Sequence, residues 1–256
     1  MDRERLRELF DLTGRVAIVT GGTRGIGRAI AEGFVAAGAS VVVASRKADA
    51  CADTEAHLKA MGGTALGVPT HIGDLDAVDA LVTRTVAELG RLDIVVNNAA
   101  NPLAEPVGHF TPEGFAKSHE VNVRGPVFLM QRSLEELTRS PCASVVNVVS
   151  AGAFLFSGSV ATYAANKAAM VAYTRAMAAA WAPRRIRVNA LAPGAVNTDM
   201  VRATTPEAQT NMEQASLQKR IAHPDELVGP ALFLASDASS YVTGQVLLAD
   251  GGLVPR

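Results

Sequence analysis

The stretch Val16-Ala17-Ile18-Val19-Thr20-Gly21-Gly22-Thr23-Arg24-Gly25-Ile26-Gly27 decides how the chain is expected to fold. Its first four residues are apolar and mostly β-branched, which is typical of a buried parallel strand. The glycine-rich turn that follows opens a segment of helical length. We expect Gly21 to permit the tight turn, Gly25 to let the backbone approach a phosphate, and Gly27 to allow close helix–strand packing. The free N–H groups of the helix would then hold a pyrophosphate.

The same alternation of strand and helix continues along the chain. Short apolar runs predict strands near residues 16–19, 41–43, 65–68, 94–96, 144–149, 186–190 and 246–248. Helices are predicted near residues 25–37, 48–61, 75–89, 112–139, 160–181 and 225–236. This repetition predicts one α/β domain over residues 1–256, a Rossmann-type doubly wound parallel sheet of about seven strands with helices on both faces.

Residues 198–223 form the one long segment with no strand in it, and they follow a predicted strand. Ligands of open α/β sheets bind outside the carboxyl ends of the strands. We therefore interpret this segment as a substrate lid. The alternative is a pair of surface helices with no part in ligand binding.

The composition excludes several classes of protein. Of the 256 residues 48% are hydrophobic and 19% are charged, which is typical of a globular chain. The 24 basic and 25 acidic residues argue against a nucleic-acid or membrane surface as the main partner. Two cysteines, Cys51 and Cys142, are too few for a disulfide framework or a metal cluster, so we expect no metal. With no signal peptide and no apolar stretch that spans a bilayer, the expected location is the cytoplasm.

The end of the second strand predicts the choice of dinucleotide. NAD sites usually carry an acid about 20 residues after the glycines, where it accepts a hydrogen bond from the ribose 2′-OH. Here Ser45, Arg46 and Lys47 follow the strand, and the first acid, Asp49, is expected to lie in the next helix. Arg46 and Arg24 could clamp a 2′-phosphate at about 1.5–3 kcal/mol for each charged hydrogen bond. The sequence therefore favours NADP(H) over NAD(H), unless Arg46 is simply a solvated loop charge.

Ser150, Tyr163 and Lys167 form a candidate catalytic set. Ser150 ends a predicted buried strand, and Tyr163 and Lys167 are four residues apart, on one helix face. A tyrosine that acts near pH 7 needs its pKa of about 10 lowered by about three units, or roughly 4 kcal/mol. A lysine ammonium about 4 Å away supplies an energy on that order. Taken alone, a tyrosine and a lysine at this spacing are more typical of an ordinary helix surface, and a serine at a strand end is more typical of a capped turn.

Together these motifs resemble the short-chain dehydrogenases/reductases, from Leu12-Thr13-Gly14 to Asp250-Gly251-Gly252. The T-G-x-x-x-G-x-G turn of that family is matched by residues 20–27. Its N-N-A-G motif appears as Asn97-Asn98-Ala99-Ala100, and its catalytic asparagine is matched by Asn122. Its P-G-x-x-x-T segment is matched by Pro193-Gly194 with Thr198.

The resemblance implies a role for each matched position. Tyr163 would exchange a proton with the substrate oxygen, Ser150 would hold that oxygen, and Lys167 would lower the pKa of the tyrosine. Asn122 would hold a water in a proton relay. The cofactor-binding positions are Gly21, Thr23, Arg24, Gly25, Ile26, Gly27, Ser45, Arg46, His71, Ile72, Asn97, Ala99, Tyr163, Lys167, Pro193, Gly194, Val196 and Thr198.

Two positions depart from the family pattern. His71 stands before Ile72 where Asp or Asn usually contacts the adenine, so adenine contacts are expected to be weaker. Ala100 replaces a glycine and adds a methyl group on the nicotinamide side of the cleft. Neither change touches the four catalytic positions.

The implied activity is NADP(H)-dependent interconversion of a ketone and a secondary alcohol. Ala153–Phe156 and Pro102–Leu103 are mainly apolar, which favours an uncharged, moderately hydrophobic substrate. A 3-oxoacyl-carrier-protein or acyl-thioester reductase remains an alternative, with Arg124, Arg132 and Arg139 as candidates for a basic patch. A non-catalytic NADP-binding sensor is an alternative of another class. The resemblance also implies a homotetramer with an interface near residues 121–139 and 160–181, although the sequence does not separate it from a dimer.

Overall fold

Residues 1–156 and 158–254 are described by a computed structural model, and among them seven strands form one parallel sheet. The strand order is β3-β2-β1-β4-β5-β6-β7. The strands are β1 (Val16–Thr20), β2 (Ser40–Ser45), β3 (Ala65–Pro69), β4 (Ile94–Asn97), β5 (Ser144–Val148), β6 (Arg187–Pro193) and β7 (Val246–Ala249). Every neighbouring pair is parallel. The Rossmann-type sheet predicted from the sequence is confirmed.

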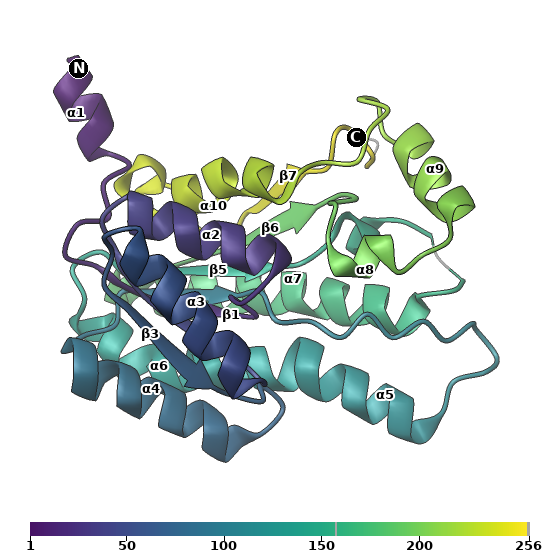
Figure 1. Ribbon diagram of the computed structural model, residues 1–256, viewed down its shortest axis with the longest axis horizontal. Coiled ribbons are helices and arrows are strands. Elements are labelled where there is room, and N and C mark those ends of the chain that lie inside the picture. Colours follow the sequence, from purple (N-terminus) through teal and green to yellow (C-terminus); the bar gives the residue numbers. More distant parts are fainter. Residues whose placement is uncertain (157, 255–256) are drawn as a thin grey trace.

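Helices cover both faces of this sheet (Figure 1). One face carries α2 (Gly25–Ala36), α3 (Ala48–Ala60) and α10 (Val228–Ala235). The other carries α4 (Leu75–Leu89), α5 (Pro112–His119), α6 (Gly125–Arg139) and α7 (Ala161–Trp181). The remaining helices are α1 (Arg3–Glu8), α8 (Asp199–Arg202) and α9 (Pro206–Ala215). Shorter turns are η1 (Glu120–Arg124), η2 (Ala151–Phe154), η3 (Ala182–Arg184), η4 (Pro224–Leu227) and η5 (Asp237–Ser239).

The central strands are apolar throughout because both of their faces are buried. In β4, Val95 belongs to the apolar cluster under α4, α6 and α7, whereas Ile94 and Val96 belong to the cluster under α2 and α10. All three side chains are 0% exposed. Successive side chains of a strand point to opposite faces, so a strand between two helical layers needs an unbroken apolar run.

The predicted helix over residues 112–139 is divided in two. Between α5 and α6 lies the π-helical turn η1, in which the N–H of Gly125 donates to the carbonyl of Glu120, five residues earlier. A Cβ on Gly125 would lie 2.0 Å from the carbonyl oxygen of Ile72. The glycine thus lets the start of α6 approach the loop after β3. The predicted helix over residues 225–236 likewise begins with a separate 3-10 turn, η4, before α10.

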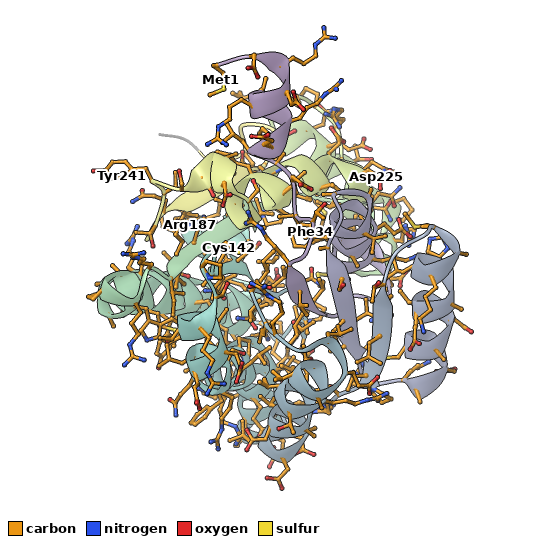
Figure 2. The ribbon with its side chains drawn as sticks, turned by 90° about the vertical axis from the view of Figure 1, so that its left-hand side faces the viewer. Met1, Phe34, Cys142, Arg187, Asp225 and Tyr241 are labelled. Carbon is orange, nitrogen blue, oxygen red and sulfur yellow. The ribbon has the colours of Figure 1, made fainter. Side chains whose placement is uncertain are left out.

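The two ends of the sheet differ. The carboxyl ends of the strands face α8 and α9, on the right in Figure 1, and α1 projects from the opposite end. Figure 2 looks onto that opposite end, where Cys142 and Arg187 lie close to its centre. The Arg187 guanidinium donates to the carbonyls of Leu234 and Ser236 at 2.8 and 3.0 Å and so ties β6 to the end of α10. No helix within the described residues is both long and apolar enough to cross a membrane.

Candidate active site

The glycine-rich turn connects β1 to the first turn of α2. Gly21 has φ +64°, and its N–H donates to the carbonyl of Ala44 at 2.7 Å. A Cβ on Gly27 would lie 2.3 Å from the carbonyl oxygen of Gly21, so only glycine allows this approach. Arg24 precedes α2 without a side-chain capping bond. The first N–H groups of α2 are therefore not capped by that side chain and suit an anionic ligand such as a pyrophosphate.

Asn98, directly after β4, forms hydrogen bonds with this turn. Its Nδ2 donates to the carbonyls of Thr20 and Gly21 at 2.9 and 3.2 Å, and its N–H donates to Oγ1 of Thr20 at 3.0 Å. Sequence analysis selected the preceding residue, Asn97, instead. The Asn97 side chain is buried within the sheet, where its Nδ2 donates to Oδ1 of Asn147 on β5 at 2.8 Å. Consecutive side chains of a strand point to opposite sides, so at the end of β4 the side chains of Asn97 and Asn98 point in different directions. This alternation is the signal that could have identified Asn98.

The end of β2 carries no carboxylate. Ser45 ends the strand, and Arg46 is exposed in the following loop. Asp49 lies in the first turn of α3, as expected, and accepts from the N–H of Ala50 at 2.8 Å. Arg24, the second arginine predicted at this site, has a side chain that is 72% exposed and forms an ion pair with Asp199 at 3.1 Å. This ion pair links the glycine turn to α8.

The other predicted cofactor positions also lie at the carboxyl edge of the sheet. His71 follows β3, and its Nδ1 accepts from the N–H of Gly73 at 3.1 Å, while Ile72 is buried. Pro193 ends β6, and the N–H of Gly194 donates to the carbonyl of Ala249 at 3.1 Å. The rest lie in the turn after β1, the first turn of α2, the loop after β4 and the segment after β6: Thr23, Ile26, Ala99, Val196 and Thr198. The fold thus gathers residues from distant parts of the chain at one edge.

The structure brings three of the predicted catalytic residues together. Ser150 follows β5, its Oγ accepts from the N–H of Gly152 at 3.1 Å, and it shares a hydrogen bond with Tyr163 in the first turn of α7. Lys167 lies one turn later, with its Nζ 5.6 Å from the centre of the Tyr163 ring. Its ammonium donates to the carbonyl of Val148 at 2.9 Å. Ser150 therefore both caps a turn and contacts the tyrosine.

Burial controls the protonation of this pair. It raises the pKa of Tyr163 to about 12, and the hydrogen bond with Ser150 acts in the opposite direction. It lowers the pKa of Lys167 to about 8. The net shift of the tyrosine pKa is upward because the loss of solvation outweighs the hydrogen bond with Ser150. Lys167 is not among the causes of this shift, so the lowering expected from the lysine stays a prediction. Tyr163 carries its proton at neutral pH.

Asn122, the fourth predicted residue, lies in the π-helical turn η1 and is 1% exposed. Its Oδ1 accepts from the N–H of Asn101 at 3.1 Å. Its Nδ2 donates to the carbonyls of Asn101 and Ser118, both at 2.9 Å, and to Oγ of Ser118 at 3.2 Å. Both amide protons are thus in use within the protein. A relay water can therefore bind this side chain only by donating a hydrogen bond to Oδ1.

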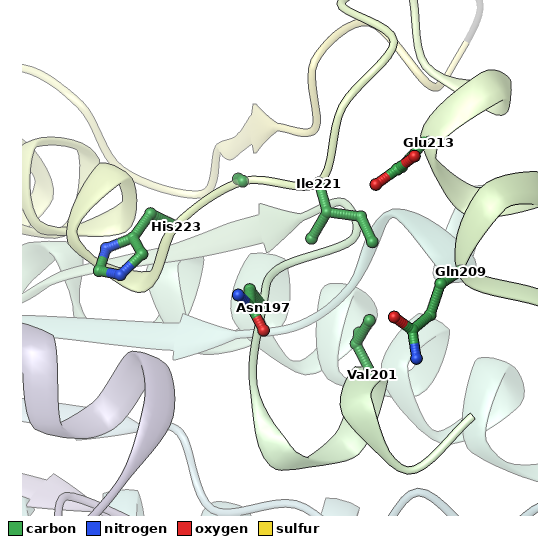
Figure 3. A pocket seen from close by; sticks show the side chains of 7 residues that line it. Asn197, Val201, Gln209, Glu213, Ile221 and His223 are labelled. Atoms are coloured by element: carbon green, nitrogen blue, oxygen red, sulfur yellow. The ribbon is translucent and has the colours of Figure 1, made fainter. Parts of the chain in front are cut away.

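The segment over residues 198–223 contains α8 and α9 and surrounds a cavity of about 260 Å³ (Figure 3). The residues that line it include Asn197, Val201, Gln209, Glu213 and Ile221. None of the four candidate catalytic residues lines this cavity. Among the residues that the structure describes, no group of His, Cys, Asp and Glu is arranged to hold a metal ion.

The chain matches a protein-family model and many known proteins in sequence and in fold. The family model described as enoyl-(acyl carrier protein) reductase matches residues 21–254. The short-chain dehydrogenase/reductase SDRA of Arabidopsis thaliana is 39% identical over 248 residues, which cover 96% of both chains.

Two solved structures are similar over nearly the whole chain. A 7α-hydroxysteroid dehydrogenase in complex with NADH and 7-oxo glycochenodeoxycholic acid has a TM-score of 0.94 at 33% identity and covers 100% of this chain and 99% of its own. A 3-oxoacyl (acyl-carrier-protein) reductase from Agrobacterium tumefaciens C58 with NADP bound has a TM-score of 0.90 at 34% identity, with 97% of each chain covered. These two similar structures therefore hold different dinucleotides.

Proposed function

The chain belongs to the short-chain dehydrogenases/reductases, and from that premise we propose that it reduces a ketone, or oxidises the matching secondary alcohol, with NADP(H). It is an oxidoreductase that acts on CH–OH or C=O groups. The observation that carries the proposal is the hydrogen bond between Ser150 and Tyr163, together with the buried ammonium of Lys167 at 5.6 Å from the centre of the tyrosine ring. This set lies at the same edge of the sheet as the glycine turn.

In the reductive direction, the hydroxyls of Ser150 and Tyr163 hold the oxygen of the ketone. The chemistry that a nicotinamide dinucleotide would supply when bound is the hydride for the new C–H bond. As negative charge develops on the oxygen, Tyr163 gives it the proton of its hydroxyl and becomes a phenolate. The Lys167 ammonium stabilises that phenolate through its positive charge, and a proton from solvent then restores the tyrosine. Oxidation of the alcohol follows the same steps in reverse.

The choice of NADP(H) over NAD(H) is supported by the charges near the end of β2. Arg46 is exposed and follows Ser45 directly, and no carboxylate ends this strand. Arg24 is also close to the turn, although Asp199 competes for its guanidinium. Hydrogen bonds to a phosphate contribute about 1.5–3 kcal/mol each, so one arginine changes affinity by roughly tenfold to a hundredfold.

The variant Arg46→Ala tests that choice. We expect the Kd for NADPH to rise by about tenfold or more and the Kd for NADH to change by less than about threefold, because only NADPH carries the 2′-phosphate. Titration of protein fluorescence with each dinucleotide measures both constants. Arg84→Ala removes an exposed arginine from α4 and is the matched control. Equal affinity of the unchanged protein for NADH and NADPH would contradict the proposal.

An uncharged, moderately hydrophobic substrate is supported by exposed apolar side chains beyond the carboxyl ends of β5 and β6. Phe154 and Phe156 are exposed in the segment after Ser150, and Met200 and Leu217 are exposed in the segment over residues 198–223. Exposed apolar groups on the segments that follow β5 and β6 suit a surface that binds an apolar ligand. The loop after β4 joins this region, since the N–H of Val107 donates to the carbonyl of Gly158 at 3.0 Å.

A carrier-protein substrate is less well supported. Its acidic carrier would need unpaired basic residues near the cleft. Arg124 donates to the carbonyl of Gly73 at 2.8 Å and pairs with Glu120, while Arg132 pairs with Asp79 at 2.7 Å. Arg139 pairs with two glutamates on its own helix. All three candidate arginines are therefore already neutralised by partners.

The deciding experiment follows the oxidation of NADPH with acetoacetyl thioesters, cyclic and terpenoid ketones, steroids, quinones and sugars. We expect turnover of one hydrophobic class. Tyr163→Phe should then lose at least about a thousandfold in kcat while NADPH binds within about threefold of its normal affinity, since the acid is lost and the dinucleotide contacts remain. Tyr173→Phe, on the exposed side of the same helix, is the control. Full activity of Tyr163→Phe would refute the assignment, and binding without turnover of any ketone or alcohol would favour the sensor.

For the assembly we infer a homotetramer in a reducing, cytoplasmic setting. The exposed side of α7 carries alanines at helical spacing, which allows a second helix to approach closely: Ala165, Ala168, Ala172, Ala176 and Ala179. Both Cys51 and Cys142 are free thiols, which suits a reducing compartment.

A further inference from the structure

A buried group of polar side chains joins α5, η1 and α7 beside the catalytic residues. Ser118, in the last turn of α5, is 0% exposed. Its Oγ accepts from Nδ2 of Asn122 at 3.2 Å and from Nδ2 of Asn166 at 3.0 Å. Asn166 is 6% exposed and directly precedes Lys167 on α7. One serine hydroxyl thus lies between the candidate catalytic asparagine and the helix that carries the tyrosine and the lysine.

These hydrogen bonds continue from Asn122 to the loop after β4. The side chain of Asn122 forms two hydrogen bonds with the backbone of Asn101, one to its N–H and one to its carbonyl. Asn101 follows Ala99 and Ala100, and the N–H of Ala99 donates to Oγ1 of Thr20, directly before the glycine turn, at 3.1 Å. An unbroken series of side-chain hydrogen bonds therefore runs from α7 through Ser118 to a loop at the edge of the site.

The series matters because buried polar groups are costly to leave without partners. Loss of the Ser118 hydroxyl would leave Nδ2 of Asn166 without an acceptor among the described residues, at a cost of about 1–3 kcal/mol. The Asn122 amide would keep its bonds to Asn101 and to the Ser118 carbonyl, but its orientation would be less constrained. The only other contact of the Asn166 amide within the described chain is with Nδ1 of the exposed His119, at 3.4 Å.

We propose that Ser118 and Asn166 are positioning residues that hold the Asn122 amide, and with it the loop at Asn101, in a fixed place relative to Lys167 on α7. The functional part of this inference rests on the proposed function, because it takes Asn122 and Lys167 as catalytic. Neither Ser118 nor Asn166 was selected from the sequence. The available signal is their spacing: Ser118 lies four residues before Asn122, on the same helix face, and Asn166 is adjacent to Lys167.

Hydrogen exchange measured by mass spectrometry tests the structural part without any substrate. In Ser118→Ala and in Asn166→Ala we expect amide exchange of the peptide over residues 98–106 to become about tenfold faster, because the acceptor for the Asn101 N–H is less firmly held. Exchange of the second half of α7 should stay within about twofold. Ser118→Cys keeps the shape of the side chain but accepts hydrogen bonds weakly, so it should behave like the alanine variant even if that variant folds poorly.

The matched control is Ser133→Ala on α6. Ser133 is also 0% exposed, and its hydroxyl has no hydrogen-bond partner among the described residues. Its loss should leave exchange over residues 98–106 unchanged. Unchanged exchange of that peptide in all three test variants would overturn the proposal.

Kinetics test the functional part. Once a substrate is known, Ser118→Ala and Asn166→Ala should each lower kcat by about tenfold to a hundredfold with KM within about threefold. The double variant should lose no more than the more impaired single variant, because both residues act through Asn122. Ser118→Thr, which keeps the hydroxyl, should recover most of the rate. Losses that multiply in the double variant, or a parallel rise in KM, would overturn the positioning role. If no turnover is found at all, the proposed function fails, while the exchange experiment still decides whether the three residues are coupled.

Discussion

At Lys167, the stability of the fold and the proposed chemistry oppose each other. The side chain is 3% exposed, and burial lowers the pKa of its ammonium from 10.5 to about 8. Such a shift corresponds to roughly 3 kcal/mol of unfavourable free energy when the group is charged. Its hydrogen bond to the Val148 carbonyl offsets a part of this, about 1.5 kcal/mol. A charge held at this cost is explained by its effect on Tyr163.

We therefore expect Lys167→Met to be inactive and more stable. At pH 7 its free energy of unfolding should exceed that of the unchanged protein by about 1–2 kcal/mol, because the buried charge is gone. Between about pH 8 and 10.5 the unfolded chain binds more protons at Lys167 than the folded chain does, so the stability of the unchanged protein rises with pH. The advantage of the variant should shrink over that range. Urea unfolding at pH 7 and pH 10.5 measures both effects, and a methionine variant that is less stable at pH 7 would contradict this account.

At the scale of the element, the turn between β1 and α2 depends on one close backbone contact. A Cβ on Gly27 would lie 2.3 Å from the Gly21 carbonyl oxygen and 2.3 Å from Nδ2 of Asn98, so either the turn or Asn98 must move. Gly27→Ala should therefore raise the Kd for NADPH by at least about a hundredfold and lower the free energy of unfolding by about 1–3 kcal/mol. Isothermal titration and urea unfolding measure the two changes.

The control is a second helical glycine with open space around it. A Cβ on Gly229 in α10 meets no atom within 4 Å. Gly229→Ala should leave NADPH binding unchanged and stabilise the fold by about 0.5–1 kcal/mol, since alanine is the better helix former. Tight NADPH binding by Gly27→Ala would show that the phosphates do not bind at this turn.

The elements also show which features could be predicted from the sequence. The strands were predicted to within two residues at most ends, because their residues are buried on both faces and so form continuous apolar runs. The division of residues 112–139 into α5, η1 and α6 was not predicted, since it depends on contacts between residues that are far apart in the sequence. These contacts are Gly125 against the Ile72 carbonyl and Asn122 against the backbone of Asn101. Ser118 and Asn98 were missed although local spacing marks both: Ser118 lies four residues before Asn122, and the side chain after Asn97 points to the other side of the strand end. The pKa of Tyr163 also could not be predicted, because residue spacing does not reveal how far a group is removed from water.

At the scale of the whole molecule, the two ends of the sheet have different roles, with the candidate site at one end and structural contacts at the other. Every candidate catalytic and cofactor-binding residue lies toward the carboxyl edge of the strands, whereas the opposite end carries structural contacts such as the hydrogen bonds of Arg187. The faces of the sheet are covered by helices (Figure 1). A second copy of the chain can therefore pack on the outer side of these helices without blocking the cleft. The exposed side of α7 suits this role, since the opposite side of the same helix positions Tyr163 and Lys167.

Ala172→Arg tests whether α7 lies in such an interface. Ala172 is exposed, in the middle of the row of alanines on that helix. If two copies of α7 pack together in a tetramer, the arginine adds bulk and like charges where the helices approach, and we expect the mass in solution to fall from that of four chains of 26.6 kDa to that of two. Light scattering coupled to size-exclusion chromatography measures this mass. Ala60→Arg places the same change at the exposed end of α3 and should keep four chains together. A tetramer that persists in Ala172→Arg would move the interface to another surface, and an unchanged protein with the mass of one or two chains would refute the tetramer itself.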